Sequence, residues 1–199
     1  MPDMLSAEGR SQFLIAMYKQ LMDETSRHIN VVWQSIGVLG GTFAAISLVE
    51  KGFMSLSLAA SLILIMCVWV GAMIIDSAYW YNRNLVIIAN IERQFLLPSD
   101  AKNIHYYFTA HRTSGTMLTH LKLQLLLALS MSAFILVVHF FSEISPIFCG
   151  VSSFHWELAL PWILAVGGAG YLIYLHSVSA TKYSEFVSKS PGADIGETG

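Results

Sequence analysis

The second apolar run of the chain reads FMSLSLAASLILIMCVWVGAMII from Phe53 to Ile75, and it contains no charged residue. A helix rises about 1.5 Å per residue, so about 20 apolar residues are needed to cross the roughly 30 Å of bilayer hydrocarbon. Because hydrocarbon offers no hydrogen bonds, the backbone groups of such a segment must bond within the segment, which favours a helix. This run predicts a membrane-spanning helix.

Three further uncharged runs have similar length, at Val31 to Val49, Leu123 to Phe141 and Leu158 to Leu175. None of them alternates apolar and polar residues, as strands of a membrane barrel would. Hydrophobic residues make up 55% of the chain and charged residues 12%, a balance that a soluble domain of 199 residues could hardly keep in solution. We expect an all-α membrane protein with four transmembrane helices in two hairpins.

The distribution of cations predicts the orientation. Of the eleven Lys and Arg residues, all except Lys51 precede the first span, lie between the second and third, or follow the fourth. The loop from Ser142 to Glu157 has neither. Because short cation-rich loops stay in the cytoplasm, both termini are expected there.

This topology divides the chain into five segments. We expect a cytoplasmic amphipathic arm at 1–29, a transmembrane hairpin at 30–76, a cytoplasmic helical insert at 77–122, a second hairpin at 123–178, and a cytoplasmic, partly disordered tail at 179–199.

The second span is expected to continue beyond the membrane as a stalk. The sequence has no Gly or Pro from Ala72 through Leu97, which predicts one helix from Phe53 to Leu97. One face of the stalk is apolar, with Glu92 in its middle, so the arm, the returning segment or another subunit must cover it. A carboxylate on such a face must be paired or neutralised. We expect Glu92 either to form an ion pair or to act in gating or ligand binding; its candidate partners are Arg112, His111 and His105.

The segment that returns from the stalk combines turn residues with aromatic and cationic ones. Pro98, Ser99 and Asp100 predict a turn and the start of a short helix that ends near Ala110. Aromatic rings beside cations can stack bases and attract phosphates, and the same residues can instead pack against the stalk. The candidate ligand or sensor residues are Tyr81, Glu92, His105, Tyr106, Tyr107, His111 and Arg112.

Small and polar residues within the spans suggest association between helices. Residues Gly37 and Gly41 form a Gly-x-x-x-Gly pair, which lets helix backbones approach closely. The residues expected in helix packing are Gly37, Gly41, Ala45, Gly167 and Gly170. Polar rings in an oligomer would instead line a pore. The pore or gate candidates are Asn30, Gln34, Thr42, Asp76 and Arg83.

No enzyme motif is visible in the sequence. It has no His-Glu-x-x-His, no Gly-rich phosphate loop and no Gly-x-Ser-x-Gly. We therefore expect no catalytic activity, no cofactor and no bound metal.

A second helix with Tyr-Trp-Tyr-Asn-Arg-Asn at the membrane and Asn-Ile-Glu-Arg-Gln-Phe-Leu beyond it, two close hairpins and a chain of this length resemble small membrane effectors of bacterial anti-phage operons. These include SLATT-like proteins and the membrane effector of the Hailong system, whose partner is a nucleotidyltransferase. The resemblance is architectural and covers the whole chain. It implies an oligomeric, ion-conducting effector of the bacterial inner membrane that responds to a nucleotide-derived signal and depolarises the infected cell.

Two functions are therefore expected from the sequence. The first is a homo-oligomeric channel or pore effector of abortive infection, expected to be a tetramer, whose cytoplasmic insert senses a nucleotide or single-stranded oligonucleotide. The alternative is a non-conducting membrane scaffold or accessory subunit that recruits a cytoplasmic partner. Ion flux distinguishes them.

Overall fold

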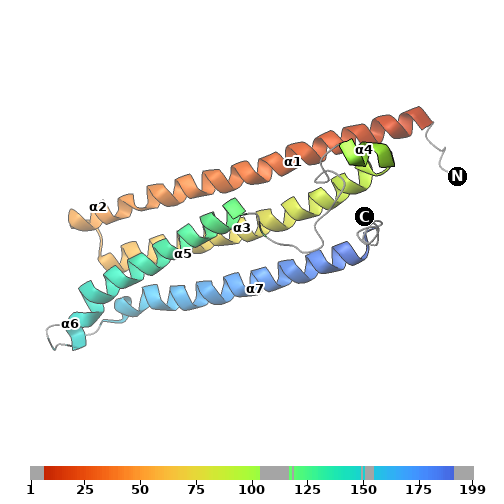
Figure 1. Cartoon of the computed structure of the whole chain (residues 1–199). Coiled ribbons are helices and arrows are strands. Elements are labelled where there is room, and N and C mark those ends of the chain that lie inside the picture. Colours follow the sequence, from red (N-terminus) through yellow and green to blue (C-terminus); the bar gives the residue numbers. More distant parts are fainter. Residues whose placement is uncertain (1–6, 104–116, 118, 149, 151–154, 191–199) are drawn as a thin grey trace. The chain divides into compact units, whose positions relative to one another are not determined.

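The structure is a computed structural model that describes residues 7–103, 117, 119–148, 150 and 155–190. Every regular element in these residues is helical (Figure 1). Four helical stretches are long and apolar enough to cross a membrane: Ala7–Glu50, Leu56–Glu92, Thr119–Phe148 and Trp156–Ser188. The predicted all-helical chain with four candidate spans is confirmed. Their arrangement as two membrane hairpins stays a prediction.

The first candidate span is continuous with the N-terminal arm. Helix α1 (Ala7–Thr42) runs through both without a break, and α2 (Ala44–Glu50) follows after a turn at Phe43. At that turn the Phe43 N–H bonds to Gly40 O at 3.2 Å, and the Ile46 N–H bonds to Phe43 O at 3.0 Å. Adjacent glycines just before the turn lower helix propensity, which explains why α1 ends there.

The central helix is shorter than predicted. Helix α3 (Leu56–Glu92) has 37 residues, and both ends of the predicted 53–97 helix lie outside it. At its start Gly52 has a φ of 72°, a turn conformation that glycine adopts readily. The Ser55 hydroxyl then accepts a hydrogen bond from the Leu58 N–H at 3.2 Å, as an N-cap does.

Helix α3 ends in a turn, where the Gln94 N–H bonds to Ile91 O at 3.0 Å and the Phe95 N–H bonds to Glu92 O at 2.9 Å in place of the helical pattern. Pro98 disfavours helical geometry in the residue before it, and it occupies the first position of a new helix, α4 (Pro98–Asn103). The Asp100 carboxylate accepts a hydrogen bond from the Leu97 N–H at 2.8 Å, which satisfies a donor at the start of α4. The predicted extension of this helix to Ala110 lies outside the described residues.

The third candidate span begins as α5 (Thr119–His139), continues through a π-helical turn (Phe140–Ile144) and ends with α6 (Ser145–Phe148). The fourth begins with a 3₁₀ turn (Trp156–Ala159) and continues as α7 (Leu160–Ser188). Pro161 lies in the first turn of α7, where its missing N–H leaves no intrahelical bond unmade.

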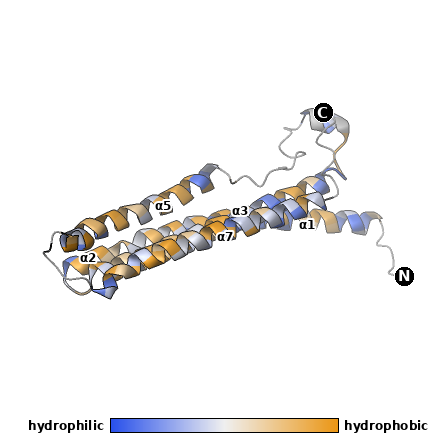
Figure 2. Ribbon diagram, turned by 90° about the horizontal axis from the view of Figure 1, so that it is seen from below, coloured by the Kyte–Doolittle hydropathy of each residue, from blue (hydrophilic) through white to orange (hydrophobic). Residues whose placement is uncertain are grey.

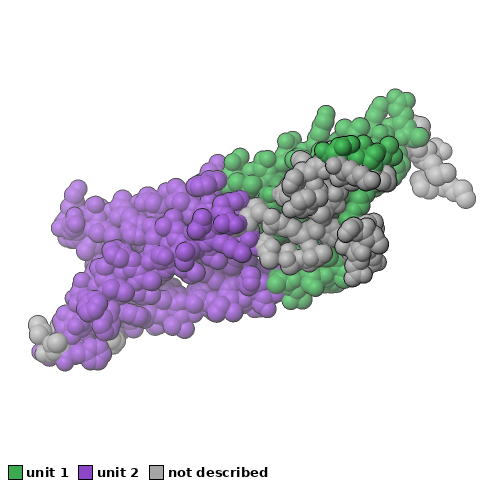
Figure 3. Space-filling model, in the orientation of Figure 1, with its two compact units in different colours: residues 1–30, 77–116, 180–199 green, residues 31–76, 117–179 purple. Residues whose placement is uncertain are grey.

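Packing contacts divide the chain into two compact units (Figure 3). Unit 1 comprises residues 1–30, 77–116 and 180–199, and unit 2 comprises residues 31–76 and 117–179. Three helices, α1, α3 and α7, have residues in both units.

Unit 2 buries its central helix and exposes the apolar surface of the others. Of the most apolar stretch of each helix, 56% is buried for α3, 17% for the third span and 11% for the fourth. Figure 2 shows hydrophobic residues along nearly the whole of α5. Large apolar side chains more than half exposed include Leu126, Phe134, Ile163, Val166 and Ile173. A surface of this kind is suited to lipid and not to water.

Two glycines let α3 and α7 approach closely within unit 2. A Cβ on Gly168 would lie closer than 3.0 Å to Val68 Cγ2, and a Cβ on Gly71 would lie 3.0 Å from Leu172 Cδ1. The missing side chains therefore determine how closely these helices pack.

Candidate functional site

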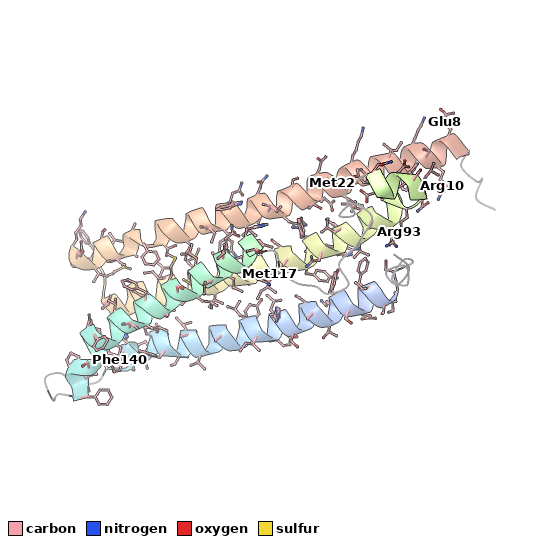
Figure 4. The ribbon with its side chains drawn as sticks, viewed as in Figure 1. Glu8, Arg10, Met22, Arg93, Met117 and Phe140 are labelled. Atoms are coloured by element: carbon pink, nitrogen blue, oxygen red, sulfur yellow. The ribbon has the colours of Figure 1, made fainter. Side chains whose placement is uncertain are left out.

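In unit 1 the N-terminal half of α1 lies beside the C-terminal half of α3 (Figure 1). The rings of His28 and Trp80 stack with centroids 6.3 Å apart. At the far end Arg10 donates a hydrogen bond to Gln94 Oε1. Figure 4 shows Arg10 and Arg93 at this same end of the unit. The arm therefore covers at least part of the apolar face of the stalk.

The contact at the centre of this interface joins Tyr18 to Glu92. The Tyr18 hydroxyl donates a hydrogen bond to Glu92 Oε1 at 3.1 Å. The carboxylate is buried, with 8% of the residue exposed, and its Oε2 has no partner among the described residues. Sequence reasoning offered Arg112, His111 and His105 as partners for Glu92; all three lie outside the described residues.

Burial controls the acid–base behaviour of both groups. It raises the pKa of the Glu92 carboxyl above its usual value, because the charged form is poorly solvated, and the Tyr18 hydrogen bond partly opposes that rise. The pKa of the Tyr18 hydroxyl is also raised, first by burial and then by the neighbouring carboxylate. Proton binding at Glu92 is thereby linked to the packing of α1 on α3.

An open cavity of about 440 Å³ lies beside this pair. Its walls are almost entirely apolar, and the residues come from α1 and from the end of α3 with the turn that follows. They are Ile15, Tyr18, Lys19, Ile91, Glu92, Phe95 and Leu96. The sequence predicted an amphipathic arm without singling out Tyr18; a hydroxyl group among the apolar residues of that arm was the available signal.

The opposite face of α3 contacts the end of α7. The Arg83 guanidinium lies 4.7 Å from the centroid of Trp80 and 5.5 Å from that of Phe186, which is cation–π geometry. The Asn90 amide donates to the Ser190 hydroxyl at 2.8 Å. Arg83, expected at a pore or gate, therefore contacts α7 within unit 1, and its role in conduction stays a prediction.

The remaining predicted pore residues differ in their surroundings. Asn30, Gln34 and Asp76 are exposed, and the structure shows no hydrogen bond from these three side chains to any described residue. Thr42 instead donates its hydroxyl to Val38 O in its own helix at 2.9 Å. The sensor candidate Tyr81 is buried, with 8% exposed.

The predicted packing residues also divide into two groups. Ala45 is buried, with 7% exposed. A Cβ added to any of the four glycines would meet no described atom within 4 Å; these are Gly37, Gly41, Gly167 and Gly170. The close approach inside the chain occurs at Gly168, which follows one of them directly. Whether the four open glycines join separate chains stays a prediction.

Unit 2 contains a buried polar pair that sequence reasoning missed. Ser57 Oγ and His139 Nε2 form a hydrogen bond of 3.0 Å, and His139 is fully buried. The other ring nitrogen, Nδ1, has no partner among the described residues. Neither residue was among the site candidates predicted from the sequence, and Ser57, the fifth residue of the apolar run that begins at Phe53, gave no separate signal.

The sensor residues proposed on the returning segment lie outside the described residues: His105, Tyr106, Tyr107, His111 and Arg112. Among the residues that the structure describes, no group of three or more His, Cys, Asp or Glu side chains could hold a metal ion. Comparison with known proteins gave no matching family model, no matching curated protein and no matching solved structure.

Proposed function

We propose that this chain is a homo-oligomeric channel or pore effector of the bacterial inner membrane, with both termini in the cytoplasm. Copies of the chain associate through α1 and enclose a polar pathway. In this proposal the chain is the membrane component of an anti-phage abortive-infection system, and a nucleotide-derived signal opens it.

One polar stripe on α1 carries this proposal. At 100° per residue, four residues fall on a single face of the helix. They are Asn30, Gln34, Gly37 and Gly41, all of them exposed. The opposite face packs inside the chain, where Val32 is 0% and Leu39 1% exposed. The polar stripe thus points directly away from the protein's own core.

Such a stripe is unfavourable for a single chain in lipid. An amide side chain without a hydrogen-bond partner costs roughly 2–7 kcal/mol in an apolar medium. The two glycines on the same face allow another helix to approach closely. Association of α1 helices would give Asn30 and Gln34 partners or water, and a ring of such amides is a polar path through hydrocarbon. A path between subunits also suits a chain with only four spans.

The abortive-infection role and the signal rest on the architectural resemblance to small anti-phage membrane effectors. That resemblance also supports a nucleotidyltransferase as the source of the signal. The aromatic and cationic residues 105–112 remain the proposed sensor.

Flux through proteoliposomes tests the channel. Gln34→Leu removes the amide from the stripe, and Gln124→Leu is a matched control, because Gln124 is buried in unit 2 with 6% exposed. If conduction follows α1, the first variant should change ion flux strongly and the second should leave it near the wild-type value. The reverse pattern would exclude a pathway along this stripe.

The alternative is a non-conducting scaffold, and one observation favours it. The described part of unit 1 exposes large apolar side chains, with Phe13 61% and Leu97 64% exposed. Such side chains suit contact with another protein. A bilayer that stays silent with the signal and its partner enzyme present, together with stable capture of a cytoplasmic protein by unit 1, would replace the channel by the scaffold.

A further inference from the structure

Two aromatic rings hold the Arg83 side chain in place within unit 1. Its guanidinium lies 4.7 Å from the ring centroid of Trp80, on the same helix, and 5.5 Å from that of Phe186 on α7. Such cation–π contacts attract the charge of the guanidinium. They supply no oxygen acceptor for its five N–H donors. The rings therefore position Arg83 without satisfying its hydrogen-bonding capacity.

The N–H donors of Arg83 are accessible. No described residue accepts a hydrogen bond from Arg83 or forms an ion pair with it; the ion pair that the structure shows in unit 1 joins Lys189 to Glu185. Arg83 is half-buried, and none of its nitrogen atoms is fully enclosed without a partner. An acceptor from outside the chain can therefore reach them. A partly desolvated cation without a carboxylate favours such a partner, and the partner is an anion.

A second cation lies one turn away from this contact on α7. Lys182 precedes Phe186 by four residues, so the two share a face of the helix. Lys182 is exposed, and no carboxylate of the described ranges pairs with it. Because Phe186 contacts Arg83, two positive charges without carboxylate partners occur where α3 meets α7.

Both cations follow the apolar parts of their helices by a similar length. Arg83 comes eight residues after Ile75. Lys182 comes seven residues after Leu175. These spacings correspond to roughly 12 and 10 Å of helix, and the headgroup layer adds about 5–7 Å to each side of the hydrocarbon. The Arg83 guanidinium points back toward the apolar part of α3, because it lies over Trp80, three residues closer to Ile75. Its charge is thus near the depth of lipid headgroups, where Trp side chains are also favoured.

We propose that Arg83 and Lys182 bind the phosphate group of an anionic membrane lipid. The guanidinium donates two parallel N–H bonds to the phosphate oxygens, and the Lys182 ammonium adds a second positive charge. A lipid with net negative charge is favoured over a zwitterionic one, because no cation of its own accompanies the phosphate. This site goes beyond the proposed channel, since it requires neither conduction nor the nucleotide signal.

Native mass spectrometry of the full chain, released from neutral detergent micelles, counts the lipids that stay bound. The probes are phosphatidylglycerol and phosphatidylcholine with identical acyl chains, added in equal amounts. We expect the first bound lipid to be phosphatidylglycerol at least about fivefold more often, the factor that one cation near an anionic surface typically gives. Soluble glycerol phosphate in excess should not displace it, because the free headgroup lacks the acyl chains that favour the lipid. Displacement would mean that the site takes a soluble phosphate, and it would overturn the lipid assignment.

Three variants locate the binding. Arg83→Gln should bring the two lipids to near-equal binding. Arg27→Gln removes the same charge from an exposed arginine of α1 in unit 1, and it should leave the preference within about twofold of the wild-type value, because water and salt screen that charge. Phe186→Leu keeps every charge and removes one ring, so it should lower the preference by at least about twofold. This variant also provides a test if the Arg83 variant does not fold.

Several results would overturn the site. Equal binding of the two lipids by the wild-type chain would do so. An equal loss of preference in Arg83→Gln and Arg27→Gln would mean that net charge alone attracts the lipid. An unchanged preference in Phe186→Leu would remove the geometry on which the site depends. Ion flux enters none of these measurements, so failure of the lipid site and failure of the channel are distinguishable.

Discussion

Replacing Gly168 by Ala tests whether the close approach of α3 and α7 is real. In a helix, Ala is favoured over Gly by about 0.5–1 kcal/mol. At this position, however, the new Cβ would lie closer than 3.0 Å to Val68 Cγ2. Val68 is β-branched and has essentially one χ1 rotamer in a helix, so it cannot rotate away cheaply. Overpacking of this kind costs about 1–3 kcal/mol.

The neighbouring glycine gives a matched control. A Cβ on Gly167 would meet nothing within 4 Å, so Gly167→Ala keeps the gain in helix propensity without the clash. The two variants should therefore differ by about 1–3 kcal/mol in free energy of unfolding, with Gly168→Ala the less stable. Reversible unfolding by SDS in mixed micelles measures this difference at a protein concentration that keeps the chain monomeric.

A double variant makes the assignment specific. Val68→Ala removes both Cγ atoms, so in a double-mutant cycle it should couple to Gly168→Ala by about 1–3 kcal/mol. Equal stability of the two single glycine variants, or a cycle without coupling, would refute the packing described for α3 and α7. A loss of stability at Gly167 that appears only at higher protein concentration would instead indicate contact between chains.

Further outcomes are expected at three other positions. Because burial raises the Glu92 pKa, the native state holds this proton more tightly than the unfolded state does. The free energy of unfolding should therefore fall as the pH rises from the usual pKa of 4.5 through the raised pKa of the folded state. Glu92→Gln should remove that slope in a pH series of unfolding curves. Ser57→Ala leaves a ring nitrogen of buried His139 unpaired and should cost about 1–3 kcal/mol in SDS unfolding, whereas Ser61→Ala, which removes only a bond to its own helix, should cost much less. Asp100→Ala removes the acceptor for the Leu97 N–H, which precedes α4. It should destabilise that turn by about 0.5–2 kcal/mol. Unchanged amide hydrogen exchange at Leu97 would contradict this.

The four apolar helices could be predicted from the sequence because their signal is local. A run of about 20 residues without charge is long enough to span hydrocarbon whatever its neighbours are. Helix ends were predictable only in part. Pro98 acts through its own geometry and was recognised, but α3 ends at Glu92, before the predicted Leu97, because Gln94 and Phe95 bond to carbonyls three residues earlier.

The candidate site depended on which helix faces meet, and this the sequence does not specify. Periodicity identified an apolar face on α3 with Glu92 in its middle, and it identified an apolar stripe on the arm. It could not pair Tyr18 with Glu92, because residues 74 positions apart are brought together only by packing. The same holds for Gly168: a side chain is excluded there only because Val68 of another helix lies so close.

The sequence by itself determined that four segments are apolar and long enough for a membrane and that these segments are helical. Hydrophobicity and backbone hydrogen bonding act within one segment, so they need no information about its neighbours. Only the tertiary structure decided which polar groups are buried together and which glycines are crowded, because burial and steric contact belong to pairs of helices and not to either helix alone.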